Sequence, residues 1–301
     1  MSIALDLKKK LPAETTNLPQ RVLGKTGELV PILGLGTAPG GIGMEDEDAM
    51  ALFEGAIDLG LTYIDTAPAY NNAQKQLGPL LQRRRNEVFL VTKTGTTSAS
   101  EARRMLEQSL QDLQTSQVDL TYVHSVGSLD VDEVLGKDGA LEGLRRAQAQ
   151  GLTRYVGFSA HNAPWKAACL LRQADVDVIM CALNPGDRHT YNFEEEVLPL
   201  ARAQNAGVAA MKVYGGTRGM SYDTPRPSAL SPHDHRQALR YALSLPGVAT
   251  AVIGIFNAGE LLQNVQWARD YTPLENSEKK DLDALGRRLS SSWGPHYGPV
   301  R

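Results

Sequence analysis

The most constraining feature of this sequence is a regular alternation between short apolar runs and longer amphipathic segments. The short runs are rich in β-branched residues, as strands are. They lie at 31–37, 61–67, 88–94, 119–125, 154–160, 177–183, 207–213 and 249–254. The longer segments repeat apolar residues every three or four positions, as helices do. They lie at 46–60, 73–84, 100–114, 141–151, 165–174, 193–204, 233–245 and 258–269.

Each predicted strand is apolar on both faces, which favours a parallel sheet covered by helices. Eight strand–helix units can close into a (β/α)8 TIM barrel, and we predict this fold. An open doubly wound sheet is the alternative. That sheet would place a G-x-G-x-x-G turn after its first strand, whereas the glycines of GLGTAPGGIG at 34–43 are spaced differently.

Two segments lie outside the repeat. Residues 20–32 carry apolar runs around a Gly-Lys-Thr-Gly turn and predict an N-terminal β-hairpin that plugs one end of the barrel. Residues 276–301 predict an extra C-terminal helix and a tail over the opposite mouth. The length of 301 residues would allow two domains, but barrels of about 250 residues are common. We therefore predict one domain over 1–301, with an N-terminal arm at 1–19.

Composition and charge argue against several classes of protein. A net charge of -3 and a pI near 6.1 give no general attraction to nucleic acid or to an anionic membrane. The two cysteines, Cys169 and Cys181, suggest neither a disulfide framework nor a metal site. The opening MSIALDLKKKLPAETT lacks the apolar core of a signal peptide. We expect a cytoplasmic monomer or weak homo-oligomer without membrane contact.

Polar residues stand where three neighbouring predicted strands end. Asp65, Lys93 and His124 end the second, third and fourth strands, and Tyr70 follows Asp65 by five residues. In a parallel barrel the substrate binds at this end of the strands. Taken singly, each residue has a structural explanation: Asp65 and Lys93 as a buried salt bridge, and His124 as a satisfied core histidine.

The combination of these four residues points to proton transfer. Free tyrosine has a pKa of about 10 and gives up its proton poorly at neutral pH unless a cation stabilises the phenolate. Lys93 would supply that charge, and Asp65 would hold the ammonium. His124 would hydrogen-bond a substrate oxygen or share the proton with Tyr70. Such a set suits hydride reduction of an aldehyde or ketone, because the carbonyl oxygen must be protonated.

The chain resembles the aldo-keto reductase family over nearly its whole length. The resemblance rests on the hairpin followed by LGLGT, YIDTAPAY, VTKT, TYVHS and VGFSAHN, in family order and spacing. It implies a (β/α)8 barrel that transfers hydride between a nicotinamide dinucleotide, NADP(H) or NAD(H), and a small-molecule carbonyl (aldehyde, ketone or sugar) or alcohol. The family's catalytic tetrad falls on Asp65, Tyr70, Lys93 and His124, with Tyr70 as general acid or base.

The resemblance also implies which residues bind the cofactor. The predicted set is Gly36, Thr37, Ser159, Asn162, Met211, Lys212, Gly215, Gly216, Gly254, Asn257, Glu260 and Asn264. Ser159 and Asn162 are expected to hold the nicotinamide carboxamide, and Asn162 is also a candidate helix cap. Lys212 and the backbone amides of Gly215 and Gly216 are expected near the pyrophosphate.

Three positions depart from the family pattern. Met180 stands where many members have glutamine, and Met211 where many stack an aromatic ring under the nicotinamide. In the adenosine segment Glu260 stands in a stretch where basic residues often grip the 2′-phosphate of NADP, although Arg218 is a further basic candidate. A carboxylate repels a phosphate and accepts a hydrogen bond from a free 2′-hydroxyl, so the pattern favours NAD or dual use.

Two other functions remain open at this point. Lys93 is a candidate Schiff-base nucleophile of the kind that class I aldolases use, although pairing with Asp65 disfavours the neutral amine that this chemistry needs. Alternatively, the chain is a regulatory barrel that binds cofactor and turns over little.

Overall fold

A computed structural model of the protein describes residues 18–217 and 228–301. Most of the predicted N-terminal arm, and Arg218, lie outside the described residues. The strands are β1 (Gln20–Val22), β2 (Leu29–Pro31), β3 (Leu33–Gly36), β4 (Tyr63–Asp65), β5 (Phe89–Thr94), β6 (Val118–Val123), β7 (Thr153–Ala160), β8 (Val178–Ala182), β9 (Gly207–Met211) and β10 (Val248–Gly254).

The helices of the described residues follow the strands in alternation. They are α2 (Ala38–Gly43), α3 (Asp46–Asp58), α4 (Ala73–Arg84), α5 (Ala99–Asp112), α6 (Val131–Leu135), α7 (Ala140–Ala149), α8 (Pro164–Gln173), α9 (Phe193–Glu196), α10 (Leu198–Ala203), α11 (His235–Ser244), α12 (Ala258–Arg269) and α13 (Asn276–Trp293). Of the described helices, none is both long and apolar enough to span a membrane.

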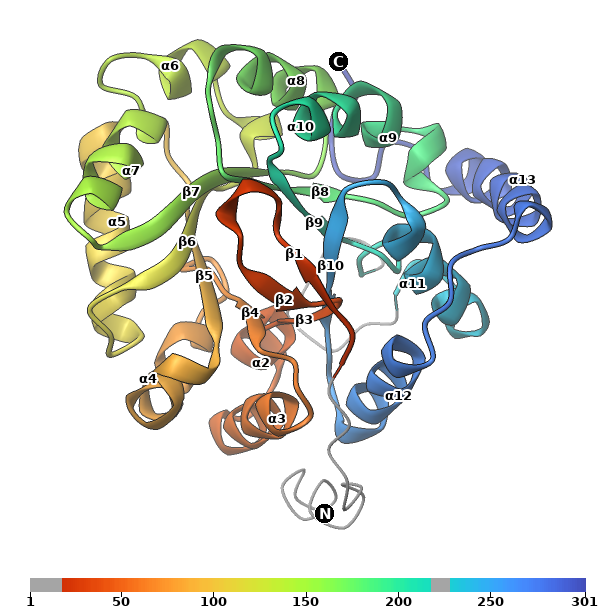
Figure 1. The fold of residues 1–301 in the computed structure, drawn as a ribbon, viewed down its shortest axis with the longest axis horizontal. Helices are drawn as coiled ribbons and strands as arrows, with labels where there is room; N and C mark the ends of the chain where they lie inside the picture. Colours follow the sequence, from red (N-terminus) through yellow and green to blue (C-terminus); the bar gives the residue numbers. More distant parts are fainter. Residues whose placement is uncertain (1–17, 218–227) are drawn as a thin grey trace.

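Strands β3 to β10 form a closed barrel of parallel strands, and the helices surround it (Figure 1). The barrel closes where β3 pairs with β10, which places Gly36 opposite Gly254. Each predicted apolar run supplies one barrel strand. The prediction of a (β/α)8 barrel is therefore confirmed, and the open sheet is excluded because no strand of the barrel has a free edge.

Successive residues of each strand alternate between the inside of the barrel and the layer beneath the helices. In β7, Tyr155 packs against the interior cluster, whereas Val156 and Phe158 belong to the outer cluster. The two-residue period of a strand then turns Ser159 and His161 inward at the C-terminal end. The same alternation carries the inward residues at the ends of the other strands to this mouth.

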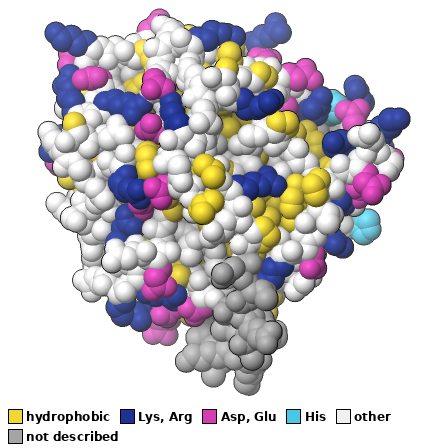
Figure 2. All heavy atoms as spheres, viewed as in Figure 1, with side chains coloured by type: hydrophobic (Ala, Val, Ile, Leu, Met, Phe, Trp, Pro, Cys, Tyr) yellow, Lys and Arg dark blue, Asp and Glu magenta, His cyan; other side chains and the backbone are white. Residues whose placement is uncertain are grey.

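The hairpin β1–β2 plugs the N-terminal end of the barrel, as predicted. Leu23 and Val30 are fully buried in the interior cluster. Gly24 has a φ of +53°, and a Cβ there would lie 2.3 Å from the backbone nitrogen of Gly207. A side chain would therefore push the hairpin off the barrel. Figure 2 looks onto this end, where acidic and basic side chains are interspersed.

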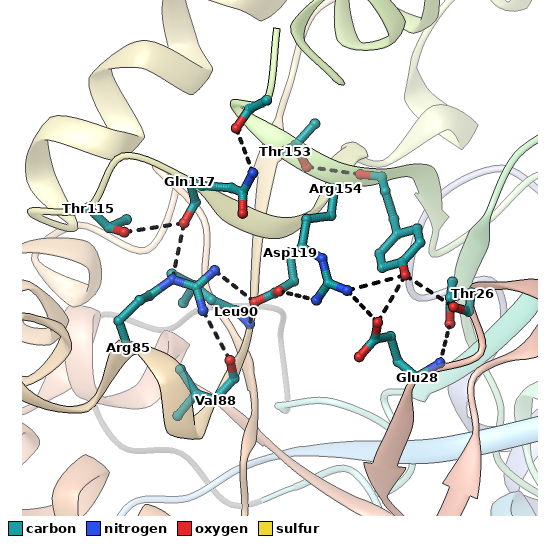
Figure 3. Close-up of polar contacts among 12 residues, drawn as sticks. Thr26, Glu28, Arg85, Val88, Leu90, Thr115, Gln117, Asp119, Thr153 and Arg154 are labelled. Carbon is teal, nitrogen blue, oxygen red and sulfur yellow. Dashed lines mark hydrogen bonds and ion pairs between the residues drawn. The ribbon is translucent and has the colours of Figure 1, made fainter. Parts of the chain in front are cut away.

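A charged network ties the hairpin to the strands at the same end (Figure 3). Asp119, only 4% exposed, accepts hydrogen bonds from the Leu90 amide and from Arg154 and forms an ion pair with Arg85, each at 2.8 Å. Arg154 also pairs with Glu28 of the hairpin. One buried carboxylate thus links β5, β6, β7 and the hairpin, at the end opposite the polar residues that follow the strands.

Two local features differ from the predictions. A single helix at 193–204 is wrong, since α9 ends at Glu196 and α10 begins at Leu198. Pro199 explains the break, because it has no N–H to bond back to the Glu195 carbonyl and its ring crowds that carbonyl. The short helices α2 and α6 were not predicted.

Asp119→Asn should lower the free energy of unfolding by about 2 kcal/mol, because Arg85 loses its negative partner and Arg154 keeps only Glu28. The figure is smaller than for a fully buried pair, since the Arg154 side chain is 39% exposed. Urea unfolding followed by circular dichroism measures it. The matched control is Glu101→Gln, which removes the exposed pair with Arg104 and should leave the unfolding midpoint unchanged. Equal stability of Asp119→Asn and the wild type would contradict the role given to Asp119.

Candidate active site

Four polar residues predicted from the strand ends meet at the C-terminal mouth of the barrel. Lys93 lies at their centre, and its Nζ donates to Asp65 Oδ1 (2.5 Å), to the Thr66 carbonyl (3.0 Å) and to Tyr70 Oη (3.2 Å). Three acceptors match the three N–H bonds of an ammonium. Asp65 and Lys93 are 3% and 1% exposed, so protein atoms surround the ion pair.

Burial and mutual attraction act in opposite directions on this pair. Burial raises the pKa of Asp65, and the charge of Lys93 acts to lower it. Burial lowers the pKa of Lys93, and the charge of Asp65 acts to raise it. The ammonium therefore keeps its charge at this depth only because the carboxylate beside it keeps its own.

Tyr70 lies in the loop between β4 and α4, which is held by short-range hydrogen bonds. The Tyr70 amide donates to the Ala67 carbonyl (3.0 Å), and the Ala73 amide donates to the Tyr70 carbonyl (3.0 Å). Gly41 of α2 presses on this loop, since a Cβ at Gly41 would lie 1.9 Å from the Tyr70 carbonyl oxygen. The Lys93 Nζ lies 4.8 Å from the centre of the phenol ring. The loop therefore fixes the phenol next to the ion pair.

His124 follows β6 directly, and its ring lies edge-on to Tyr70 with the ring centres 6.3 Å apart. Burial, with smaller contributions from the charges of Lys93 and Lys212, lowers the pKa of His124 to about 3. The imidazole is therefore neutral at physiological pH. A neutral imidazole offers one N–H donor and one acceptor.

A cavity opens beside these residues. Asp65 and Tyr70 line it, together with His161 from the end of β7, Met180 of β8 and Met211 of β9. These two methionines are positions at which the sequence departs from the family pattern. They make this part of the cavity wall apolar.

A second cavity continues from the first, because both are lined by Tyr214, Ser228, Gly254 and Phe256. Trp267 and other residues of α12 line the second cavity but not the first. At Gly254, where the two cavities meet, a Cβ would lie 2.9 Å from Pro39 Cγ.

The two cavities form an elongated trough that fits a nicotinamide dinucleotide. Such a ligand has two flat ring systems joined by an anionic linker. The trough has an apolar part beside Tyr70, the rings of Tyr214 and Phe256 where the two cavities meet, Trp267 in the second cavity, and Lys212 in the wall of the first. This composition suits a ligand that has flat rings and an anionic linker.

The residues predicted to bind the cofactor fall into two groups. Those lining the trough are Gly36, Met211, Lys212, Gly216, Gly254, Glu260 and Asn264. Those outside its lining are Thr37, Ser159, Asn162, Gly215 and Asn257. The Thr37 hydroxyl donates to the Asp65 carbonyl, the Ser159 hydroxyl accepts from the Ser125 amide, and the Asn257 side chain caps α12.

Asn162 holds the C-terminal tail. Its Nδ2 donates to the Tyr297 carbonyl at 2.7 Å. The predicted helix cap is wrong, since α8 begins at Pro164, Ala163 precedes it, and no side chain caps it. The Tyr297 ring lies 6.2 Å from the ring of His161 at the mouth of the barrel. The tail therefore folds over this mouth, as predicted.

The sequence analysis did not single out His161 or Tyr214, although both line the first cavity, the one beside Tyr70. A signal for His161 was present, because it stands two positions after Ser159 and so shares its inward face. Tyr214 carried no such signal, since it lies beyond the last strand residue of β9 in a loop whose path the strand period does not determine.

Comparisons with known proteins agree with this geometry. The sequence model of the Aldo/keto reductase family matches residues 32–237. The L-galactose dehydrogenase of Arabidopsis thaliana is 29% identical over 83% of this chain and 88% of its own length. The pyridoxal 4-dehydrogenase of Microbacterium luteolum is 25% identical over 85% of this chain and 94% of its own length.

Solved structures share the same fold. A Bacillus halodurans aldo-keto reductase in its holo form superposes with a TM-score of 0.73 at 24% identity, over 89% of this chain and 96% of that one. An aldo/keto reductase from Klebsiella pneumoniae in complex with NADP and acetate superposes with a TM-score of 0.64 at 22% identity, over 88% and 95%. From the match over residues 32–237, the chain belongs to the aldo-keto reductase family, whose members are oxidoreductases that use a nicotinamide dinucleotide.

Proposed function

We propose that this protein transfers hydride reversibly between a nicotinamide dinucleotide and the carbonyl carbon of a small molecule, with Tyr70 as general acid and base. The observation that carries the proposal is the contact of Lys93 Nζ with both Asp65 and Tyr70 Oη in the wall of the cavity. The bound dinucleotide supplies the hydride in reduction and accepts it in oxidation.

Tyr70 completes the reduction by protonating the oxygen. As a carbon–hydrogen bond forms, the electron pair of the C=O double bond moves to oxygen, and the proton of Tyr70 Oη moves to that oxygen. The ammonium of Lys93, 3.2 Å away, stabilises the phenolate that remains. Asp65 holds the ammonium in place. Oxidation of an alcohol runs through the same atoms in reverse.

His124 acts as a hydrogen-bond donor to the same oxygen. Its pKa of about 3 leaves no proton to give away as an acid at neutral pH, so sharing the catalytic proton with Tyr70 is the weaker of its two possible roles. Its neutral N–H, held beside the phenol, orients the carbonyl oxygen toward Tyr70.

The hydrogen bonds of Lys93 argue against an aldolase. A Schiff-base lysine attacks through a nitrogen lone pair. All three N–H directions of Lys93 already meet acceptors, namely Asp65, Thr66 and Tyr70. The amine is therefore held as an ammonium whose hydrogen bonds would all be lost on imine formation.

The substrate we propose is a small aldehyde, ketone, sugar or alcohol. The named activities of two relatives, on L-galactose and on pyridoxal, support a compact and hydroxylated compound. A panel of sugars and aromatic aldehydes, tested in both directions, ranks the candidates by kcat/KM.

For the cofactor we propose a preference for NAD(H). Glu260 lines the second cavity, and its carboxylate is fixed by the Phe256 amide (2.9 Å) and by Asn257 Nδ2 (2.9 Å). Among the described residues that line this cavity none is a lysine or arginine. A 2′-phosphate would therefore meet a fixed negative charge there, whereas a free 2′-hydroxyl can donate a hydrogen bond to it.

Tyr70→Phe should lower kcat for carbonyl reduction by at least about a hundredfold, because the proton donor is removed. The dissociation constant of NADH, followed by fluorescence, should change less than about threefold. Tyr155→Phe is the matched control, since that phenol contacts Glu28 at the opposite end of the barrel, and its kcat should equal the wild-type value. Full turnover by Tyr70→Phe would remove Tyr70 as the acid. Cofactor binding by the wild type without turnover of any substrate would favour the regulatory barrel.

The stability of the wild type should fall as the pH drops from about 6.5 toward 3. In this window an unfolded histidine binds a proton that the folded His124, with its lowered pKa, does not. His124→Gln should therefore lose less stability than the wild type between pH 7 and pH 4.5, measured as the urea midpoint. His233→Gln, at an exposed histidine, is the control. Identical pH slopes for His124→Gln and the wild type would show that His124 is not held neutral.

Glu260→Gln should tighten NADPH binding by about tenfold and change NADH binding much less, because a like-charge contact near the surface is removed. The ratio of the two dissociation constants measures the effect, and Glu142→Gln on α7 is the control. A wild-type protein that binds NADPH more tightly than NADH would refute the preference.

A further inference from the structure

The end of α13 packs against the loops that follow β8 and β9. The indole of Trp293, the last residue of α13, sits in a notch between two glycines of these loops. A Cβ on Gly215 would lie 2.6 Å from Trp293 Cη2, and a Cβ on Gly186 would lie 2.6 Å from Trp293 Cζ3. Only glycine leaves room for the indole at either position. The ring therefore holds the loop after β8 against the loop after β9.

The loop at 212–217, which follows β9, has a conformation that needs support. Lys212 has a φ of +56°, and Gly215 and Gly216 have φ values of +74° and +69°. A residue with a side chain is strained at positive φ and keeps that conformation only where its surroundings hold it. The Lys212 carbonyl accepts from the Gly215 amide (2.7 Å) and from Asn184 Nδ2 (3.0 Å). The bond from Asn184 ties the strained turn to the loop after β8.

A buried carboxylate connects Asn184 to the C-terminal tail. Asn184 Nδ2 also donates to Asp187 Oδ2 (2.5 Å), and the Asp187 amide donates to Asn184 Oδ1 (2.9 Å). Asp187 Oδ1 accepts from His296 Nε2 of the tail at 2.9 Å. Asp187 is 1% exposed, so loss of either donor would leave a buried acceptor unpaired. The tail and the turn at Lys212 thus belong to one chain of hydrogen bonds.

The loop that the tail supports forms part of the wall of the first cavity. Lys212, Gly216 and Thr217 line that cavity, whereas Gly215 packs on Trp293 behind it. A cation in a tight turn at the cavity wall suits an anion, and the anionic part of a dinucleotide is its pyrophosphate linker. The position of this loop therefore decides how well the linker is received.

We propose that Trp293 and the His296–Asp187 pair are positioning residues for the cofactor, because they hold loop 212–217 in the conformation that receives the pyrophosphate. Trp293 and His296 line neither cavity, so they act through the loop and not on the ligand. A loop released from the tail would have to be ordered when the ligand binds, and the lost conformational entropy would weaken binding. This inference rests on the proposed function, because it requires a dinucleotide in the trough.

The contacts with the loop are separate from those that anchor the tail over the mouth. The Tyr297 carbonyl accepts from Asn162 Nδ2, and the Tyr297 amide donates to Tyr191 Oη at 2.7 Å. Neither bond involves Trp293 or His296. A substitution at either residue can therefore free the loop while Asn162 and Tyr191 keep the tail in place.

The test measures the dissociation constants of ADP-ribose, which carries the pyrophosphate without the nicotinamide, and of NADH by calorimetry. Trp293→Ala and His296→Leu should each weaken both ligands by about tenfold, because the ligand must then order the loop. Trp293→Phe keeps a ring in the notch and His296→Gln keeps a donor for Asp187, so both should bind within about threefold of the wild type. Trp165→Ala is the matched control and should bind as the wild type does, since that indole is 45% exposed and lines neither cavity.

Hydrogen exchange of the ligand-free protein gives a measurement that does not depend on activity. The amide of Gly215, bonded to the Lys212 carbonyl, should exchange faster in Trp293→Ala and His296→Leu than in the wild type. The KM for the carbonyl at saturating NADH should stay within about twofold, since the bonds that anchor the tail over the mouth remain.

Three results would overturn the inference. Unchanged ADP-ribose binding with a raised KM for the carbonyl would assign Trp293 and His296 to the substrate. A lowered urea midpoint with unchanged dissociation constants would assign them to stability alone. Weakening by Trp293→Phe and His296→Gln as large as by Trp293→Ala and His296→Leu would show that neither the ring nor the hydrogen bond matters. A wild-type protein that binds neither ADP-ribose nor NADH would instead remove the proposed function, and the inference with it.

Discussion

The rest of the site depends on one ammonium held out of water. Moving a lysine charge into a protein interior costs several kcal/mol, and only close partners offset that cost. Here a carboxylate, a carbonyl and a phenol surround Lys93. The barrel makes this possible, because the pairing of β4 with β5 sets Asp65 beside Val91 and brings Lys93 within reach two residues later. The same charge adds to the effect of burial, which keeps His124 and His161 neutral.

The features that follow from strand period and chain order were predictable from the sequence. The eight apolar runs predict the barrel, and the parallel arrangement requires Asp65, Lys93 and His124 to reach the same mouth. The contact between Asn162 and Tyr297 could not be predicted, because the two residues are 135 positions apart and their loops have no repeating pattern. The break between α9 and α10 could have been predicted from Pro199. It was missed because apolar residues repeat at helical spacing across the whole segment.

The two ends of the barrel differ in how far their buried polar groups have partners. At one end the hairpin and Asp119 bind strands to one another through satisfied charges. At the other end the trough keeps buried polar atoms without partners, namely Asp65 Oδ2 and His161 Nδ1. A protein that leaves such atoms unpaired gives up stability where ligands bind.

The pairing of β3 with β10 has a consequence for how the molecule is made. The first and last strands of the cylinder lie side by side, although more than two hundred residues separate Gly36 from Gly254. A chain still emerging from the ribosome cannot close the cylinder until β10 has been synthesised, so β3 waits with an open edge. During translation that edge is a place where chaperones, or neighbouring nascent chains, can pair with the protein.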